Sequence, residues 1–162
     1  GNVAGSRGSV IPFFIEARES GEIPITDTRM TRFLITLNEA VETVLYALSE
    51  MQGSEIFVRK SPSVNIIDLA NTIAPKCSLK EIGMRPGEKL HEQLISLDES
   101  KYTYEFDNYF KILSPLNNWD LCNKRTSGGK KVHKGFSYTS DNNKAWLKNE
   151  KLKHWLSQVE FK

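Results

Sequence analysis

The residues with the most distinctive chemistry lie in one short turn, Arg85-Pro86-Gly87-Glu88. Proline at its second position and glycine at its third are typical of a type II turn, which brings the Cα atoms of Arg85 and Glu88 within about 7 Å of each other. A guanidinium makes paired, charge-assisted hydrogen bonds to phosphate, and a neighbouring carboxylate accepts from a sugar diol. The turn therefore predicts a site for a phosphorylated sugar or nucleotide. The alternative is a solvated turn with an incidental ion pair.

The start of the chain offers a second candidate anion site. The loop Gly5-Ser6-Arg7-Gly8-Ser9 runs directly into a predicted helix. The free amides and the positive end of a helix attract anions, and Arg7 adds a charge. Further along, Arg29 and Arg32 lie three residues apart. Either these groups contribute to one anion site, or the loop is a flexible capped segment and the arginines are solvated.

The elements that would position these groups follow an α/β pattern. Ser9 is expected to cap a helix over about residues 10–19, which ends before Gly21. Strand and helix then alternate, as in an α/β fold. The expected elements are an extended stretch at 22–26, a helix from 37 to 52 introduced by the capping box Thr36-Leu37-Asn38-Glu39, a buried strand at 55–58, a helix capped near Asn65 and ending at 73, and a strand at 80–84.

The helix expected at 37–52 carries an apolar stripe, formed by Leu37, Val41, Val44, Leu45, Leu48 and Met51. After about residue 97 the pattern changes. An aromatic, alternating stretch at 102–113, broken at Asp107-Asn108, predicts a hairpin. A long polar loop at 114–135 and short helices within 141–159 follow, and the apolar face of those helices is Trp146, Leu152, Trp155 and Leu156.

Composition excludes several classes of protein. The net charge of +2 over 162 residues is too small to indicate nucleic-acid binding. The lysines within 124–134 have no accompanying aromatic series, so a solvated loop is expected there. No apolar run approaches the ~20 residues that span a bilayer. Cys77 and Cys122 form no CxxC motif, which predicts reduced thiols in a cytoplasmic protein and no metal site.

Motifs for catalysis are missing from the sequence. It contains no GxGxxG, and none of its tyrosines is followed by a lysine four residues later. The scattered histidines, His91, His133 and His154, have no evident partner and are expected to be structural or solvated. We therefore expect binding residues in this chain but no catalytic ones.

Several motifs occur in an order that identifies a family resemblance. They lie at 1–3, 5–14, 23–27, 29–33, 55–58, 85–92 and 136–143. Together they closely resemble the C-terminal half of nucleotide-sugar 4,6-dehydratases of the extended short-chain dehydrogenase/reductase superfamily, and most of all the inverting UDP-N-acetylglucosamine 4,6-dehydratases. The resemblance covers nearly the whole chain and is weakest at 114–134.

This resemblance implies an α/β fold, namely the C-terminal part of an extended short-chain dehydrogenase Rossmann-type fold with a small mixed substrate-binding subdomain. Residues 1–96 would form the end of the dinucleotide-binding fold plus that subdomain, and residues 97–162 the hairpin, polar loop and short helices. NADP is the implied cofactor and a UDP-sugar the implied substrate. The resemblance also implies a homo-oligomer through the full-length protein, with no nucleic-acid or membrane partner.

The resemblance further implies roles for individual residues. The residues expected to bind substrate are Asn2, Val10, Thr26, Arg32, Arg85 and Glu88. Arg32 and Arg85 would face the pyrophosphate, and Glu88 would accept from a ribose hydroxyl. Val10 and Thr26 would lie near the uracil or ribose. The residues expected to line the nicotinamide end of the cofactor are Val3, Ala4, Gly5, Ser6 and Arg7.

The implied reaction converts UDP-N-acetylglucosamine to a UDP-4-keto-6-deoxy sugar with inversion at C5, for surface polysaccharide or protein glycosylation. The family's dinucleotide loop, tyrosine-lysine pair and acid/base groups would precede position 1. We therefore expect the N-terminus to be a cut and this polypeptide alone to be inactive. The alternatives are a non-catalytic UDP-sugar-binding module and another extended short-chain dehydrogenase, such as a nucleotide-sugar epimerase.

Overall fold

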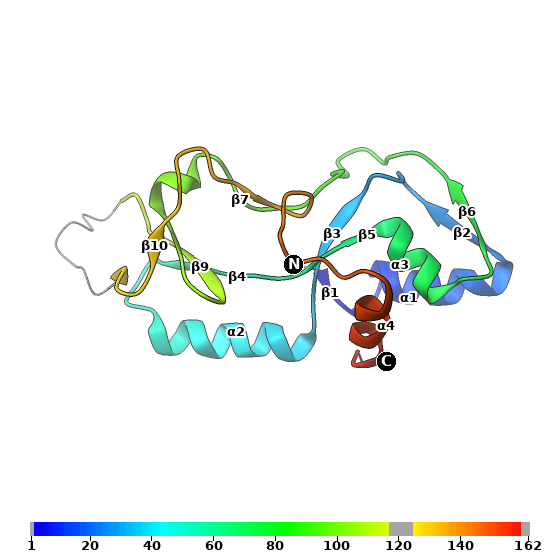
Figure 1. Cartoon of the computed structure of the whole chain (residues 1–162), viewed down its shortest axis with the longest axis horizontal. Helices are drawn as coiled ribbons and strands as arrows, with labels where there is room; N and C mark the ends of the chain where they lie inside the picture. The colour runs from blue at the N-terminus through cyan, green and yellow to red at the C-terminus, as the bar shows by residue number, and fades with distance from the viewer. Residues whose placement is uncertain (1, 117–124, 160–162) are drawn as a thin grey trace. The chain divides into compact units, whose positions relative to one another are not determined.

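The computed structural model describes residues 2–116 and 125–159 (Figure 1). The chain divides into two compact units: Gly1–Leu37, Ser61–Glu92 and Ser140–Lys162 form the first, and Asn38–Lys60 with Gln93–Thr139 form the second. The units interleave along the sequence, and a domain division at residue 96 stays a prediction. Cys122, Lys124 and the middle of the polar loop predicted at 114–135 lie outside the described residues.

The first unit contains two small sheets. In one, β3 (Thr31–Ile35) lies between β1 (Asn2–Val3), which is parallel to it, and β5 (Ser63–Asn65), which is antiparallel. In the other, β2 (Glu22–Ile25) pairs in parallel with β6 (Ser78–Glu81). Every residue of β3 is buried, so this strand, which the sequence did not predict, forms the centre of the unit.

The helices of the first unit cover these sheets. They are α1 (Val10–Ala17), which continues as the 3₁₀ turn η1 (Arg18–Ser20), α3 (Ile66–Ile73) and α4 (Asn149–Ser157). Gly21 ends η1 in the left-handed conformation, and Asn65 caps α3 by accepting from the Ile67 amide at 2.8 Å, as predicted. Ser9 occupies the N-cap position of α1, as predicted, although its buried hydroxyl makes no hydrogen bond with the described residues.

The second unit is built on an antiparallel sheet in the order β10-β8-β9-β4. Its strands are β4 (Ile56–Arg59), β8 (Thr103–Glu105), β9 (Tyr109–Ile112) and β10 (Lys130–Lys131). β8 and β9 form the predicted hairpin, with its break at Asp107-Asn108. The short turn η2 (Glu99–Tyr102) precedes β8, and β7 (Gln93–Ile95) pairs separately with β11 (Tyr138–Thr139).

Helix α2 (Leu37–Glu50) contacts this sheet through one polar and aromatic side. The Tyr46 hydroxyl donates to the Tyr109 hydroxyl at 2.8 Å, and Arg59 of β4 forms ion pairs with Glu39 and Glu42. These contacts fix which side of the helix faces the strands. The apolar stripe predicted for this helix lies elsewhere on its surface.

One burial prediction for this unit is wrong. The strand at 55–58 was expected to be buried, but β4 is an edge strand of the described sheet, and Ile56 is 55% exposed. Helix α2 has no buried residue at all among those described, and its stripe residues Val44 and Leu48 are 59% and 64% exposed. β4 buries only Val58, and the apolar stripe of α2 is not covered by any of residues 2–116 and 125–159.

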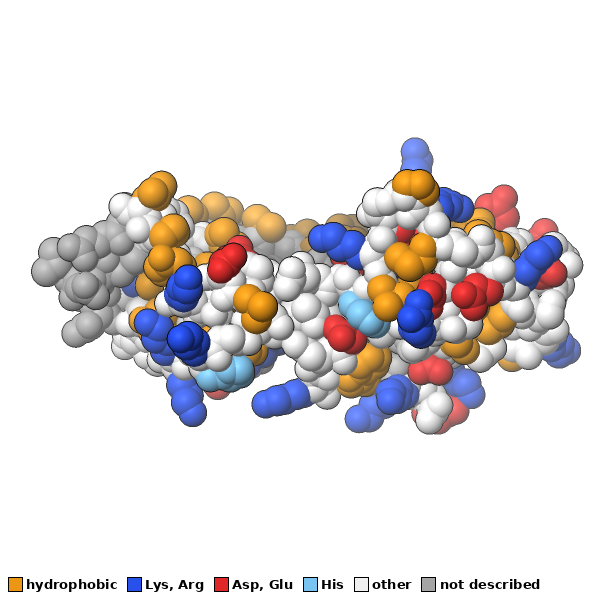
Figure 2. All heavy atoms as spheres, turned by 90° about the horizontal axis from the view of Figure 1, so that it is seen from above, with side chains coloured by type: hydrophobic (Ala, Val, Ile, Leu, Met, Phe, Trp, Pro, Cys, Tyr) orange, Lys and Arg blue, Asp and Glu red, His pale blue; other side chains and the backbone are white. Residues whose placement is uncertain are grey.

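The surface is of mixed charge. On the face shown in Figure 2, lysine and arginine side chains alternate with aspartate and glutamate, as expected for a chain with a net charge of +2. None of the described helices is long and apolar enough to span a membrane. The expected α/β fold class is confirmed by the mixture of helices with parallel and antiparallel strands.

Candidate functional site

A pocket of about 380 Å³ in the first unit brings together every residue predicted to bind substrate. These residues are Asn2, Val10, Thr26, Arg32, Arg85 and Glu88. They come from β1, the start of α1, the segment between β2 and β3, strand β3 itself and the turn after β6. Parts of the chain far apart in sequence therefore meet around one cavity.

Apolar side chains that the sequence analysis did not select form much of the pocket wall. They include Phe13 of α1, Pro24 of β2, Met30 and Ile66. Phe13 is 43% exposed, which leaves an aromatic face available to a ligand. Its spacing from Val10, three residues along a helix, was a signal that could have found it, because residues three apart share a helix face.

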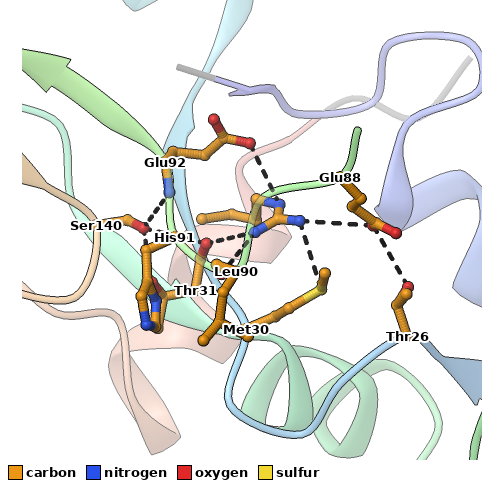
Figure 3. Close-up of polar contacts among 9 residues, drawn as sticks. Thr26, Met30, Thr31, Glu88, Leu90, His91, Glu92 and Ser140 are labelled. Atoms are coloured by element: carbon orange, nitrogen blue, oxygen red, sulfur yellow. Dashed lines mark hydrogen bonds and ion pairs between the residues drawn. The ribbon is translucent and has the colours of Figure 1, made fainter. Parts of the chain in front are cut away.

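Arg32 is the most constrained cation of the pocket and is only 8% exposed. Its Nη1 donates to the carbonyl oxygens of Thr31 at 2.8 Å and Leu90 at 3.1 Å. Its Nη2 lies 3.6 Å from a Glu88 carboxylate oxygen, and its Nε lies 3.5 Å from one of Glu92 (Figure 3). The guanidinium is thus held in one orientation by the backbone, and two carboxylates compensate its burial.

Glu88 connects this cation to the turn. One carboxylate oxygen accepts from the Thr26 hydroxyl at 3.4 Å, and the other accepts from the Arg85 backbone amide at 3.3 Å. Gly87 has a φ of +81°, and the Glu88 amide donates to the Arg85 carbonyl, as the predicted turn requires. The ion pair of Glu88 is with Arg32, whereas the Arg85 side chain is exposed and forms no ion pair with the described residues.

The two arginines of the pocket therefore differ in how far nearby carboxylates already neutralise their charge. Arg32 and Arg85 line it together with the carboxylates of Glu16 and Glu88. Because Arg32 is already paired, Arg85 is the cation with its charge less compensated. An anion entering the pocket would meet Arg85, the positioned guanidinium of Arg32 and apolar side chains, all of which line the same cavity. Phosphate and a flat aromatic base match this combination.

The residues predicted to bind cofactor lie beside this pocket but do not line it. Ser6 closes a tight turn by donating from its hydroxyl to the Val3 carbonyl at 2.8 Å, and Ala4 belongs to the core at 8% exposure. Gly5 and Gly8 have φ values of +77° and +73°, a conformation that favours glycine. The exposed Arg7 and the backbone amides of this glycine-containing loop are hydrogen-bond donors of the kind that bind anions. Their role in binding a cofactor stays a prediction.

Arg29, unlike Arg32, does not line the pocket. Its guanidinium pairs with Asp27 at 2.7 Å, and 72% of its side chain is exposed. Hydrogen bonds from the Arg29 side chain and backbone amide lower the pKa of Asp27 to about 2. This pair lies outside the pocket lining, so Arg29 is a partner of Asp27 rather than a second cation of the pocket.

A further hydrogen-bonded cluster lies behind Arg32. The Thr31 hydroxyl lies 2.8 Å from His91 Nδ1 and 2.6 Å from the Ser140 hydroxyl. His91 therefore has a structural role, which is one of the two roles expected for the histidines. No group of histidine, cysteine, aspartate and glutamate among the described residues is arranged to hold a metal ion.

Comparisons with known proteins identify the family of this chain. The profile of the family described as polysaccharide biosynthesis protein matches residues 1–114. The UDP-N-acetylglucosamine 4,6-dehydratase (inverting) of Campylobacter jejuni serotype O:2 is 48% identical, over 99% of this chain and 50% of that protein. The UDP-glucose 4-epimerase of Rickettsia bellii strain OSU 85-389 is 38% identical, over 99% of this chain and 48% of that protein.

A solved structure gives the same result for the fold. The X-ray structure of Pen from Bacillus thuringiensis matches with a TM-score of 0.80 and 35% identity, over 97% of this chain and 46% of that one. The chain spans about half the length of the curated relatives that it matches. The resemblance predicted from the motifs is confirmed, and the chain belongs to the polysaccharide biosynthesis protein family.

Proposed function

We propose that this chain supplies the substrate-binding part of an NADP-dependent nucleotide-sugar 4,6-dehydratase that acts on UDP-N-acetylglucosamine with inversion at C5. One observation carries the proposal: residues selected for binding a UDP-sugar line one pocket, although they are spread from position 2 to position 88. The 48% identity to a protein named as the inverting dehydratase supports it, and the 38% identity to a UDP-glucose 4-epimerase makes epimerisation the second candidate.

In this proposal the pocket binds the UDP moiety. The diphosphate lies between the Arg32 fork and Arg85, where charge-assisted hydrogen bonds stabilise it. Glu88 accepts from a ribose hydroxyl, and the uracil packs on the wall formed by Val10 and Phe13. Anchoring the nucleotide in this way orients the sugar, and correct orientation of a reacting group is a large part of enzymatic rate enhancement.

The chain's own contribution is therefore binding and orientation. Residues Val3 to Arg7 would hold the nicotinamide end of NADP, which supplies hydride chemistry when bound. The product would be a UDP-4-keto-6-deoxy sugar for surface polysaccharide or protein glycosylation. The protein would work in the cytoplasm as a homo-oligomer. A non-catalytic UDP-sugar-binding module would use the same pocket residues.

Calorimetric titration of the 162-residue chain with UDP, UMP and uridine tests the pocket assignment. We expect affinity to fall in that order, because each step removes a phosphate from the two arginines. Equal affinity for UDP and uridine would contradict a diphosphate site at Arg32 and Arg85. Dehydratase and epimerase are separated in a longer protein that contains this chain, by whether UDP-N-acetylglucosamine gives a 4-keto-6-deoxy product or its C4 epimer.

A further inference from the structure

A buried hydroxyl from the C-terminal part of the first unit lies at the centre of the cluster behind Arg32. Ser140 is 0% exposed. Its Oγ accepts from the Glu92 amide at 2.9 Å and donates to the Thr31 carbonyl at 3.1 Å, while its own amide donates to the Glu92 carbonyl at 2.8 Å. Ser140 thus joins two segments that are far from it in sequence (Figure 3).

One arrangement of protons satisfies all these contacts. His91 donates from Nδ1 to the Thr31 hydroxyl, the Thr31 hydroxyl donates to Ser140 Oγ, and Ser140 Oγ donates to the Thr31 carbonyl. Ser140 Oγ then accepts two hydrogen bonds and donates one, which is the full capacity of a hydroxyl. A buried network in which every member is satisfied is rigid.

Both residues that Ser140 holds are direct partners of Arg32. The Thr31 carbonyl accepts from Arg32 Nη1 at 2.8 Å, and the Glu92 carboxylate lies 3.5 Å from Arg32 Nε. These partners contact two different nitrogens of the guanidinium and so fix its plane. A binding group has to be held within about 0.5 Å of its productive position by such supporting contacts.

We propose that Ser140 is a positioning residue that orients Arg32 toward the diphosphate, although Ser140 does not line the pocket. The inference rests on the proposed function, because it assumes that Arg32 binds the diphosphate. It makes the segment after β11 a determinant of nucleotide affinity. Without the Ser140 hydroxyl, the Thr31 and Glu92 groups lose their shared partner and the guanidinium loses its fixed plane.

The test compares Ser140→Ala with a matched control, Ser63→Ala. Ser63 is also 0% exposed and belongs to the same unit, and its hydroxyl accepts from Asn143 at 2.9 Å. Both substitutions remove a buried hydroxyl, so both should lower the melting temperature measured by circular dichroism. Only Ser140→Ala should weaken UDP binding in calorimetry, by about 5-fold, which corresponds to the loss of one hydrogen bond. Equal UDP affinities for the two variants would overturn the inference.

A double-substitution cycle asks whether Ser140 acts through Arg32. In an Arg32→Lys background, Ser140→Ala should cause no further loss of UDP affinity, since the planar fork that it positions is already gone. An undiminished additional loss would overturn the inference. If Ser140→Ala does not fold, the nearly isosteric Ser140→Cys replaces it, and unchanged affinity in that variant would have the same meaning. Failure of the unsubstituted chain to bind UDP would instead reject the proposed function.

Discussion

Removing the guanidinium of Arg85 is expected to weaken UDP binding while leaving the fold intact. The side chain is exposed and lies on a turn whose shape is set by Gly87 and by the backbone hydrogen bond from Glu88 to Arg85. Arg85→Ala keeps both of these features. The melting temperature should therefore stay close to that of the unsubstituted chain, as for ordinary surface substitutions.

The size of the effect follows from the exposure of Arg85. A hydrogen bond to a charged group contributes about 1.5–3 kcal/mol. Solvent screens an exposed guanidinium, so the lower end applies, and about 1.5 kcal/mol corresponds to roughly a 10-fold rise in the Kd. Arg85→Lys should recover only part of this loss, because an ammonium group cannot reproduce the planar fork.

Lys89 provides the matched control for this measurement. It carries the same charge, is exposed on the same segment, and does not line the pocket. Calorimetric titration of UDP should give a weakened Arg85→Ala and an essentially unchanged Lys89→Ala. If both variants lose affinity equally, the attraction is a general charge effect. If neither changes, Arg85 is a solvated turn residue, and the diphosphate assignment at this turn is wrong.

Three other outcomes are expected. Glu88→Gln should weaken UDP binding less than Arg85→Ala, because an amide oxygen still accepts from a hydroxyl; a larger loss in the same titration would show that pairing with Arg32 matters more. The folded pKa of Asp27 is about 2, below its usual 3.8, so its carboxylate stabilises the fold above about pH 4 and this contribution is lost as the pH falls toward 2. Replacing its partner, in Arg29→Met, should raise the pKa of Asp27 as measured by NMR. The 162-residue chain alone should form no 4-keto product from UDP-N-acetylglucosamine, and a product detected by mass spectrometry would contradict this.

Local signals in the sequence predicted the local structure well. The helix after Ser9 and its end at Gly21 followed from periodicity and from glycine's tolerance of a positive φ. The turn at 85–88 followed from proline and glycine. The pocket residues were predicted in two different ways. Arg85 and Glu88 were predicted from the chemistry of their side chains in a turn, whereas Asn2 and Val10 were predicted only from the family resemblance.

The remaining features depend on contacts between distant residues. Ser140 meets Thr31 across 109 positions, and no spacing rule relates residues so far apart. The core strand β3 was missed because Arg32 and Thr31 make its pattern look polar, although both are buried. The exposure of the α2 stripe could not be predicted, because an amphipathic pattern tells which side of a helix is apolar and not whether anything covers it.

That uncovered helix has a thermodynamic consequence. Side chains such as Val44, Leu45 and Leu48 are each about 60% exposed, and fully burying a side chain of this kind is worth about 1.5–3 kcal/mol. Covering the stripe would therefore add several kcal/mol, comparable with the whole unfolding free energy of many domains, about 5–15 kcal/mol. In the sheet formed by the described residues, β4 is an edge strand, and the backbone groups of such an edge can pair with another strand. The melting temperature of this chain should therefore depend on its binding partners as well as its sequence. It should rise with the concentration of any molecule that binds the apolar stripe of α2.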